Sequence, residues 1–322
     1  MEYFLAVDGG GTKTDLALFD DRGRLVARER RGPSNYQNVG ADGAEALLRD
    51  GIQALLETHS LQLSDVSGAC LGLAGLDTRE DELAYEAIIR NVFGDQASMI
   101  RFENDCFIAL HSGTLGGAGI ALIAGTGSMA IGCNERGERA RSGGWGHRFG
   151  DEGSGKFIGH EAIVRSLKAR DGRGEETALV RLIEEMEQCD LFDLVTRLNI
   201  ESPGPDKIAS YAPLVTQAAE AGDAVALQIL EDAARELVTA ARAITRRLEF
   251  ERRPIRFILR GGAFHSNILR DRVEAGLRSI DPESECMLPL LPPVAGAFVL
   301  ALQSKGIEIT PEIEANLKAG LT

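Results

Sequence analysis

The sequence predicts an α/β protein of two related domains with a ligand cleft between them, and three observations carry this prediction. The chain has 322 residues with 44% hydrophobic content, more than one small core needs. A strand, a glycine-rich turn and a second strand occur twice, around Asp8–Thr14 and Gly125–Ser128. Strand and helix patterns alternate after the first of these copies. Two lobes usually enclose a cleft, and a cleft is where ligands bind.

The first copy is a three-stranded meander. Apolar runs at Tyr3–Val7 and Leu16–Phe19 flank the glycine-rich turn Asp8–Thr14. A second turn, Asp21–Gly23, leads into the third strand, Leu25–Arg28. No helix follows the glycines, so no helix dipole is available there to bind phosphate. The backbone N–H groups of the turn must then cradle any phosphate that binds.

The second copy repeats this order. Strand Ile120–Ala124 runs into the turn Gly125–Ser128 and then into Met129–Cys133, and a further turn follows at Glu135–Gly137. In both copies the glycine of the next turn stands 11 positions after the threonine of the glycine turn. A duplicated domain explains this match, and it predicts two glycine turns that face a shared ligand.

Between the two copies the sequence predicts alternating helices and strands. The expected elements are helices at Asp42–Thr58 and Glu80–Val92, strands at Ser67–Leu73 and Met99–Phe102, and a helix after Asp105. The first domain is therefore expected to span residues 1–115, with the C-terminal segment of about 303–322 packing back on it.

The second domain is expected to span residues 116–302 and to carry a helical insertion. Residues 155–248 read as mainly helical, with a loop at Ser202–Asp206. Asp223 is a good N-cap for a long helix that packs on a sheet. The remaining expected elements are a strand at Ile255–Leu259, a glycine turn at Gly261–Phe264, a helix at Asn267–Leu277, an apolar helix at Val294–Leu302 and a peripheral tail from Ile307.

The charge balance limits the partners. With 35 basic and 49 acidic side chains the formal net charge is -14, so the average field repels nucleic acid and acidic membrane surfaces. The segment before Gly9 is too short and too acidic for a signal peptide or a membrane span, which predicts a cytoplasmic protein. The 5 cysteines are scattered, as reduced thiols are, and neither they nor the 5 histidines have the spacing of a zinc or iron–sulfur site.

The glycine turns have the residues that phosphate binding needs. Glycine lets the backbone approach a phosphate, hydroxyls at Thr12 and Thr14 add donors, and Asp8 can hold a hydrated magnesium ion. A tight hairpin without a ligand is the alternative for the first turn taken alone. The matching turn Gly125–Ser128 favours a ligand, because two such turns suit the two ends of a triphosphate. A third turn, Gly261–Phe264, offers a flat surface for a nucleotide base.

Asp105 is the candidate general base. It follows the end of a predicted strand and opens a helix, at the edge where ligands of α/β sheets usually bind. A carboxylate there can accept the proton of a sugar hydroxyl as the oxygen attacks a γ-phosphorus. An aspartate at a helix start often serves only as the N-cap of that helix. The position of Asp105 fits a catalytic base and an N-cap equally well, so the sequence leaves both interpretations open.

The most specific segment is Gly143–Gly155, which packs 6 glycines, two acids and the only tryptophan into 13 residues. It has no hydrophobic period and so is not expected in a core. Glycine at this density indicates that the backbone contacts a ligand, and Asp151 with Glu152 can bind several hydroxyls of a polyol. Pro33–Asn38 is a second polar loop, whose amide side chains can bind sugar hydroxyls or an acetamido group.

At these residues the sequence resembles the N-acetylglucosamine kinase and BadF/BadG/BcrA/BcrD ATPase family, within the actin, hexokinase and Hsp70 superfamily. The likeness covers nearly the whole chain in order, including the three glycine turns and the Pro-rich entry to the last long helix. The pair Asn104–Asp105 and the block Gly143–Ser154 resemble the N-acetylglucosamine kinase branch in particular. The resemblance implies two actin-like (ribonuclease H-like) domains, a nucleotide and sugar cleft between them, ATP and Mg²⁺ as cofactors, and domain closure on sugar binding.

The resemblance also implies roles for single residues. Asp105 is the implied catalytic base, and Asp8 is the implied magnesium residue, acting through water. The implied ATP-binding residues are Asp8, Gly10, Gly11, Thr12, Lys13, Thr126, Gly127, Ser128, Gly261, Gly262 and Ala263. The implied sugar-binding residues are Asn35, Asn104, Asp105, Thr126, Gly144, Trp145, Asp151 and Gly155.

The sequence departs from the resemblance in one turn. Ala74–Asp77 stands where N-acetylglucosamine kinases often have a serine-glycine-glycine turn, which removes one sugar hydroxyl contact. Glucosamine or another hexose is therefore a competing substrate. The zinc cysteines of the ROK sugar kinases and the cluster cysteines of the benzoyl-CoA reductase activators are absent from the sequence, which disfavours both of these relatives.

The sequence thus predicts an ATP-dependent sugar kinase, with the 6-hydroxyl of N-acetylglucosamine as the expected acceptor. The alternatives are a kinase for glucosamine or another hexose and an ATPase that activates a partner enzyme. A third alternative, a catalytically silent sugar-binding regulator, is disfavoured by the presence of Asp105 and of all three glycine turns. Related folds often dimerise, so the resemblance implies a homodimer, although no apolar stripe in the sequence identifies an interface.

Overall fold

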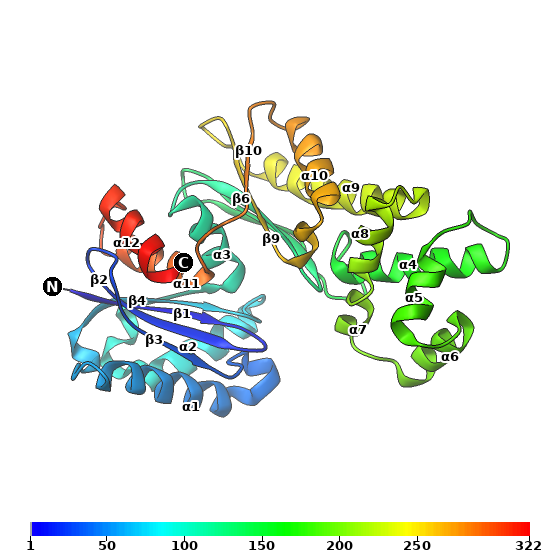
Figure 1. Cartoon of the computed structure of the whole chain (residues 1–322). Helices are drawn as coiled ribbons and strands as arrows, with labels where there is room; N and C mark the ends of the chain where they lie inside the picture. The colour runs from blue at the N-terminus through cyan, green and yellow to red at the C-terminus, as the bar shows by residue number, and fades with distance from the viewer. Residues whose placement is uncertain (1) are drawn as a thin grey trace. The chain divides into compact units, whose positions relative to one another are not determined.

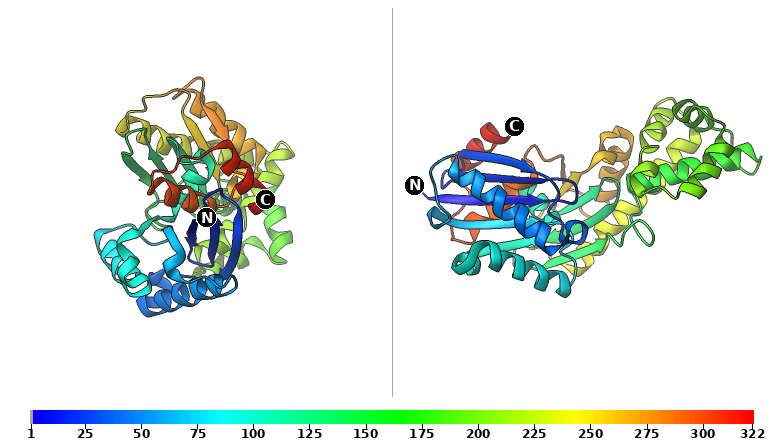
Figure 2. Two further views of the ribbon diagram at one scale, coloured as in Figure 1. Left: turned by 90° about the vertical axis from the view of Figure 1, so that its left-hand side faces the viewer. Right: turned by 90° about the horizontal axis from the view of Figure 1, so that it is seen from below.

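The structure of the chain, a computed structural model, describes residues 2–322 and falls into two compact units (Figure 1). Unit 1 joins the segment that ends at Gly117 to the segment Leu288–Thr322, and unit 2 is Ala118–Met287. Both ends of the chain thus belong to unit 1, where Figure 2 shows the blue and red segments side by side. Each unit is built on one 5-stranded sheet with helices packed against it.

The sheet of unit 1 has the strand order β3-β2-β1-β4-β5. Its strands are β1 (Tyr3–Gly9), β2 (Thr14–Asp20), β3 (Leu25–Arg31), β4 (Val66–Leu73) and β5 (Ile100–Asn104). β1, β2 and β3 pair antiparallel, while β1, β4 and β5 run parallel. Side chains alternate between the two faces: Leu5 and Leu18 enter one hydrophobic cluster, Phe4 and Phe19 the other. The predicted meander is confirmed.

Helices cover both faces of this sheet (Figure 1). The Leu5 face carries α1 (Tyr36–Glu57) and α2 (Arg79–Phe93), and the Phe4 face carries α3 (Asp105–Thr114), α11 (Pro293–Gln303) and α12 (Pro311–Leu321). Short 3₁₀ helices at Leu63–Asp65 and Gly94–Met99 precede β4 and β5. α1 begins before the predicted Asp42, because the Asn35 side chain caps it by accepting from the backbone of Gln37.

Unit 2 repeats the sheet of unit 1. Its strand order is β8-β7-β6-β9-β10, with β6 (Gly119–Ala124), β7 (Ser128–Cys133), β8 (Arg139–Gly143), β9 (Arg256–Arg260) and β10 (Glu285–Met287). The first three strands pair antiparallel, and β9 and β10 continue from β6 in parallel. Order and directions match those of unit 1, so the predicted repetition is confirmed. The first glycine turn joins β1 to β2, and the second joins β6 to β7.

The helices of unit 2 surround a single hydrophobic cluster. They are α4 (Gly155–Arg170), α5 (Leu179–Glu187), α6 (Leu191–Glu201), α7 (Pro205–Ala209), α8 (Ala212–Glu220), α9 (Ala224–Arg247), the 3₁₀ helix Gly262–His265 and α10 (Asn267–Arg278). As predicted, Asp223 caps α9, accepting from Ala226 N at 2.9 Å, and α9 packs on β6, β7 and β8. The loop predicted at Ser202–Asp206 is partly wrong, because α7 begins at Pro205, a residue suited to the first position of a helix.

The predicted domain boundaries are wrong for the last long helix. The sequence assigns Val294–Leu302 to the second domain, whereas α11 packs in unit 1 against α3, β1 and β4. Every residue from Val294 to Leu302 is buried, since a helix that is apolar on all sides needs contacts all around. The tail from Ile307 is not peripheral either, because α12 buries Ile313 and Leu317 in the same cluster.

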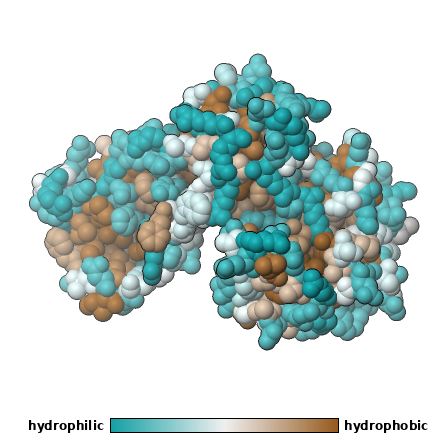
Figure 3. Space-filling model, turned by 180° about the vertical axis from the view of Figure 1, so that it is seen from behind, coloured by the Kyte–Doolittle hydropathy of each residue, from teal (hydrophilic) through white to brown (hydrophobic). Residues whose placement is uncertain are grey.

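None of the described helices is both long and apolar enough to cross a membrane. Most of the face drawn in Figure 3 is hydrophilic, and the hydrophobic residues on it form scattered groups. Two of the most exposed large hydrophobic side chains, Trp145 and Phe149, belong to the glycine-rich block. The part of the block around Trp145 and Phe149 is therefore outside the cores, as its lack of hydrophobic period predicts, whereas Asp151 and Ser154 near its end are buried.

Candidate functional site

The first glycine turn presents backbone N–H groups that the protein itself does not use. The turn joins β1 to β2, and Gly10 N donates to Lys13 O at 3.0 Å to close it. The N–H groups of Gly11, Thr12 and Lys13 donate to no acceptor among the described residues, and all three residues are exposed. Successive N–H donors of this kind form a concave site for an anion. The turn can therefore bind phosphate oxygens.

The two threonines of this turn differ in what they offer. Thr12 is exposed, whereas Thr14 is fully buried. The Thr14 hydroxyl donates to Gly32 O at 2.9 Å and lies 2.8 Å from the Ser34 hydroxyl. The prediction that both hydroxyls add donors for a phosphate is therefore wrong for Thr14, whose single hydroxyl hydrogen is already used.

The first turn is tied to the loops that carry the other candidate residues of unit 1. Gly10 O accepts from Asn35 N at 3.3 Å, and Gly9 O accepts from Ala74 N at 2.8 Å. These bonds fix the turn against the start of α1 and against the loop after β4. Anion donors and candidate sugar-binding residues are thus held in one small region of unit 1.

Asn35 lies against the loop after β4, and only the oxygen of its side-chain amide is engaged. Its Oδ1 accepts from Gln37 N at 3.0 Å. Gly75 leaves room for it, because a Cβ there would lie only 2.7 Å from Asn35 Oδ1, and the φ of +79° also favours glycine. The Nδ2 group of Asn35 donates to no acceptor in the described part of the chain. It is therefore able to donate to a carbonyl or hydroxyl oxygen of a ligand.

Asn104 holds the same loop from β5. Its Oδ1 accepts from Cys106 N at 2.9 Å, which caps α3. Its Nδ2 donates to Leu76 O at 3.1 Å and to Asp77 Oδ1 at 3.3 Å. Both amide hydrogens are engaged, which leaves a ligand only a lone pair of Oδ1. The geometry assigns Asn104 mainly to holding the loop and the start of α3.

Asp105 is the first residue of α3, directly after β5, and it is not the helix cap, since Asn104 fills that role. Burial raises the pKa of the Asp105 carboxyl above its usual range, and the nearby Asp77 carboxylate raises it further. The Cys106 thiol, with Sγ 3.6 Å from Asp105 Oδ1, acts in the opposite direction. A helix N-terminus ordinarily favours an ionised carboxylate, but here desolvation outweighs it. Asp105 is therefore not needed as a cap, and its carboxylate can accept a proton.

The second glycine turn repeats the anion donors of the first, in unit 2. Gly125 N donates to Gly127 O at 2.9 Å to close the turn between β6 and β7. The N–H groups of Thr126 and Gly127 donate to no acceptor among the residues that the structure describes. The Thr126 hydroxyl, in contrast, is held by Asp206, donating to its Oδ1 at 2.7 Å. This turn, too, can bind phosphate oxygens through its backbone.

Ser128 joins the second turn to the glycine-rich block. Its N–H donates to Asp151 Oδ1 at 3.3 Å, and its hydroxyl donates to Glu152 O at 2.6 Å. Asp151 has a φ of +64°, which is uncommon outside glycine, and a Cβ at Gly127 would lie 3.0 Å from its carboxylate carbon. Both donors of Ser128 are therefore used within the protein, so the contact predicted between Ser128 and ATP has no free donor to make it.

The end of the block is pinned to the same turn. Gly155 N donates to Gly125 O at 2.7 Å, and Lys156 N donates to Thr126 O at 3.1 Å. A Cβ at Gly155 would lie 2.9 Å from Gly125 O, so a side chain does not fit without displacing the backbone. Three predicted residues, Thr126, Asp151 and Gly155, are thus brought together around one turn.

Gly144 and Trp145 lie on an exposed part of the block. Trp145 is 71% exposed, and the Arg141 guanidinium carbon lies 5.0 Å from the centroid of its ring. Arg141 also donates to Gly144 O. Among the described residues no hydrogen bond or ring contact joins this pair to Asp151 or Gly155. The structure therefore brings together only part of the predicted sugar-binding set of unit 2.

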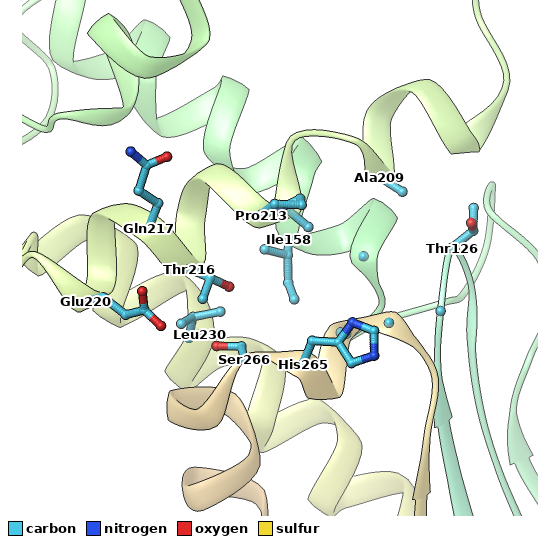
Figure 4. A pocket seen from close by; sticks show the side chains of 15 residues that line it. Thr126, Ile158, Ala209, Pro213, Thr216, Gln217, Glu220, Leu230, His265 and Ser266 are labelled. Atoms are coloured by element: carbon cyan, nitrogen blue, oxygen red, sulfur yellow. The ribbon is translucent and has the colours of Figure 1, made fainter. Parts of the chain in front are cut away.

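The third glycine turn closes a pocket of about 690 Å³ in unit 2 (Figure 4). Gly261 has a φ of +109° and approaches β6 so closely that a Cβ would lie 2.3 Å from Ala124 O. Only glycine fits at this contact. The next two residues, Gly262 and Ala263, line the pocket together with the second glycine turn. The two predicted nucleotide turns of unit 2 thus share one cavity.

Residues of α8 line the end of this pocket that lies away from Thr126 in Figure 4. Thr216, Gln217 and Glu220 supply polar groups there. The other lining residues are Gly155, Ile158, Ala209, Ala212, Pro213, Leu230, His265 and Ser266. A cavity of this size, with apolar walls and few polar groups, fits a nucleoside. Sequence reasoning missed the α8 residues, because they lie on an ordinary amphipathic helix that no motif marks.

The residues at the first turn fit a hydrated Mg²⁺. Asp8 is a half-buried carboxylate near the end of β1, just before the exposed N–H donors. Mg²⁺ in proteins usually keeps several waters and is bound through one or two carboxylates together with substrate phosphates. Asp8 supplies a ligand of this kind, and a bound ion would offset the negative charge of the phosphates.

The chain matches the BadF/BadG/BcrA/BcrD ATPase family over residues 5–301. It belongs to this family. The family predicted from the sequence motifs is therefore confirmed, and its description as an ATPase family makes nucleotide binding a property of the family.

Family members of similar length include kinases of amino sugars. The chain is 32% identical over 316 residues to the N-acetyl-D-glucosamine kinase of Dictyostelium discoideum, an alignment that covers 94% of this chain and 99% of the relative. It is 33% identical to the N-acetylmuramic acid/N-acetylglucosamine kinase of Clostridium acetobutylicum, over 94% of this chain and 98% of the relative. The predicted class of enzyme, an ATP-dependent sugar kinase, agrees with the names of these relatives.

Among solved structures, a proposed N-acetylglucosamine kinase from Chromobacterium violaceum superimposes with a TM-score of 0.71 and 26% identity. The match covers 93% of this chain and 99% of that chain. The predicted fold class, an α/β protein of two actin-like units, is confirmed by this match and by the repeated sheet order.

Proposed function

We propose that this chain transfers the γ-phosphoryl group of ATP to the 6-hydroxyl of N-acetylglucosamine. The observation that carries the proposal is Asp105, a carboxylate whose pKa is raised by burial and by Asp77, a residue of the loop that Asn35 and Asn104 contact. Kinase relatives that align over nearly the whole chain support the same reaction.

In the proposed reaction Asp105 accepts the hydroxyl proton as the sugar oxygen attacks the γ-phosphorus. The new bond joins the sugar oxygen to phosphorus, and the bond to the β-phosphate oxygen breaks, so ADP leaves. The unused N–H groups of the two glycine turns bind the phosphate oxygens, and the pocket beside Gly262 takes the nucleoside. Asp8 would hold Mg²⁺ through water, and the bound ion would supply positive charge for the phosphates.

Asn35 supports an acetamido substrate. Its Oδ1 is engaged by the start of α1, while its Nδ2 is available to donate to the carbonyl oxygen of an acetamido group. The competing substrate is glucosamine, whose ammonium would be attracted by the Asp77 and Asp105 carboxylates near the same loop. The two sugars differ only in this group, so a comparison of their turnover tests which interaction dominates.

The proposal predicts that ADP release from ATP and Mg²⁺ rises about tenfold or more when N-acetylglucosamine is added. The measurement compares it with N-acetylmuramic acid, glucosamine, glucose, N-acetylmannosamine and no sugar, and phosphorus NMR of the product identifies the 6-phosphate. Strong stimulation by glucosamine alone would mean that the substrate carries a free amine and not an acetamido group. A rate of ATP hydrolysis that is the same with every sugar and with none would instead favour an ATPase that activates a partner enzyme.

The raised pKa of Asp105 predicts the acid limb of the pH profile. Below this pKa the carboxyl is protonated and cannot accept the hydroxyl proton, so kcat is expected to fall at a pH above the usual value of about 3.9 for an aspartate. Asp77→Asn removes a nearby negative charge but keeps an oxygen for Asn104. We expect it to move the acid limb to lower pH. The measurement is kcat against pH at saturating substrates.

Two outcomes of this measurement would contradict the role of Asp105. One is a wild-type acid limb at the pKa of an ordinary exposed aspartate. The other is an acid limb that Asp77→Asn leaves in place or moves to higher pH. Asp42→Asn, a change on the exposed side of α1, is the matched control and should leave the profile unchanged.

A further inference from the structure

The Thr126 side chain in the second glycine turn is held by a residue 80 positions later. The hydroxyl donates to Asp206 Oδ1 at 2.7 Å. Asp206 stands in the first turn of α7, in the helical insertion of unit 2. The sequence motifs implicate Thr126 in binding both ATP and sugar, and they say nothing of Asp206.

The direction of this hydrogen bond limits what Thr126 can do for a ligand. A threonine hydroxyl has one hydrogen and two lone pairs, and an ionised carboxylate only accepts. The hydrogen must therefore point at Asp206, which leaves the lone pairs of Thr126 Oγ1 for a ligand. Phosphate oxygens at neutral pH are acceptors as well, so they find no partner in this side chain. A sugar hydroxyl, which can donate, does find one.

The backbone of Thr126 offers the opposite kind of hydrogen-bonding group, a donor. Its N–H group, like that of Gly127, donates to no acceptor among the described residues, so it suits a phosphate oxygen. Thr126 thus offers a donor through its backbone and an acceptor through its side chain. One residue can serve both substrates without competition, provided that Asp206 holds the hydroxyl hydrogen.

The segment that carries Asp206 is firmly packed. Gly159 of α4 approaches α7 so closely that a Cβ there would lie 1.9 Å from Ile208 O. The next residue, Lys207, forms an ion pair with Glu187, and its ammonium lies 5.0 Å from the centroid of the Tyr211 ring. Asp206 itself remains exposed. Its carboxylate is therefore held at the second turn by the surrounding packing and contributes little to that packing itself.

Resting on the kinase function proposed above, we propose that Asp206 is a positioning residue for the sugar: it orients Thr126 so that the hydroxyl accepts a hydrogen bond from a sugar hydroxyl and does not donate to phosphate. The negative charge of Asp206 beside the turn also makes the side-chain face of Thr126 unfavourable for a phosphate oxygen. The two predicted roles of Thr126 then belong to different atoms.

Asp206→Ala is expected to raise the KM for the sugar about fivefold to tenfold, because Thr126 is then free to turn its hydrogen toward the ligand. The KM for ATP should stay unchanged or fall, since a negative charge near the phosphates is lost. Asp206→Asn keeps an acceptor for Thr126 and should bring the sugar KM back to within about twofold of wild type. The measurement is steady-state turnover with each substrate varied in turn.

Thr126→Val removes the hydroxyl that Asp206 holds, and it serves as the background for a double-mutant cycle. In that background Asp206→Ala should have no further effect on the sugar KM, because the two side chains act through one hydrogen bond. Thermal midpoints and ADP affinity, measured on every variant, report folding and the nucleotide pocket separately. The thermal midpoints are expected to match wild type, and the ADP affinity of Asp206→Ala is expected to stay unchanged or to rise.

Two results would overturn the inference while leaving the kinase proposal intact. One is active wild type together with an unchanged sugar KM in Asp206→Ala. The other is a rise in the KM for ATP without a rise for the sugar, which would assign the hydroxyl to phosphate. Wild-type protein without any sugar-dependent turnover would remove the proposed function and this inference with it.

Discussion

Replacing Asp105 with asparagine is expected to lower kcat by about 10²- to 10⁴-fold while leaving ATP affinity unchanged. Asparagine has nearly the same shape, and Asn104 still caps α3, so the local backbone is expected to hold. An amide, however, cannot accept the hydroxyl proton. Asp105 is not among the residues that line the nucleoside pocket, so nucleotide binding should not respond. The measurement is kcat at saturating substrates, together with calorimetric ATP affinity.

The stability of the same variant separates a lost base from a lost fold. Because burial raises the pKa of Asp105 in the folded chain, the stability that this group contributes is present at low pH and is lost as pH rises through the raised value. At neutral pH the ionised carboxylate is therefore unfavourable, and asparagine removes this penalty. We expect the thermal midpoint of Asp105→Asn to equal or exceed that of wild type. A kcat within threefold of wild type would exclude Asp105 as the base.

The parts of the fold that the sequence predicted are those in which local pattern and burial agree. Along β1 and β2 alternate side chains enter opposite cores, Leu5 and Leu18 on one face and Phe4 and Phe19 on the other. The first and second glycine turns each stand between two antiparallel strands, so the repeated meander is recognisable from the residue pattern alone. The long α9 was predicted in the same way, from one apolar stripe and from Asp223 at its start.

The assignment of α11 was not predictable in this way. An apolar pattern on all sides of a helix predicts that the helix is buried, but it does not indicate which of two similar sheets the helix packs on. The close contact that decides the matter is between backbones, at Gly296 of α11 and Ile108 of α3, and glycine leaves no pattern that identifies its partner. The same limit applies to Asp206, which meets Thr126 only through the folding of the helical insertion.

The candidate site was predictable where backbone chemistry defines it. Glycine turns after apolar strands predict unused N–H groups, and the structure has them at Thr12 and at Thr126. Side-chain roles were less predictable, because a hydroxyl or amide can equally serve the protein. Ser128 uses both of its donors internally, and Asn104 uses both of its amide hydrogens. Only the hydrogen-bond partners separate these residues from Asn35, whose amide nitrogen has none among the described residues.

Gly296→Ala is expected to destabilise unit 1 by about 2–4 kcal/mol. In most helices alanine is the better residue, by roughly 0.5–1 kcal/mol. At Gly296 a Cβ would lie 1.9 Å from Ile108 O and 2.6 Å from Ser112 N, both backbone atoms of α3. Backbone cannot turn aside as a side chain can, so α11 and α3 must separate and lose part of the buried contact between them. A thermal midpoint lower by roughly 5–15 °C would follow.

Gly43→Ala is the matched control for this prediction, because it makes the same change within α1, where the nearest atom to a Cβ is 3.3 Å away, on the Val39 side chain. We expect it to be neutral or stabilising, since helix propensity then acts alone. Equal midpoints for the two variants would mean that α3 shifts at little cost. That outcome would also weaken the case for a fixed Asp105, because Asp105 and Ile108 belong to the same helix. A lower thermal midpoint in Gly296→Ala alone, together with a raised sugar KM measured on the folded fraction of that variant, would link the packing of α11 to the placement of Asp105.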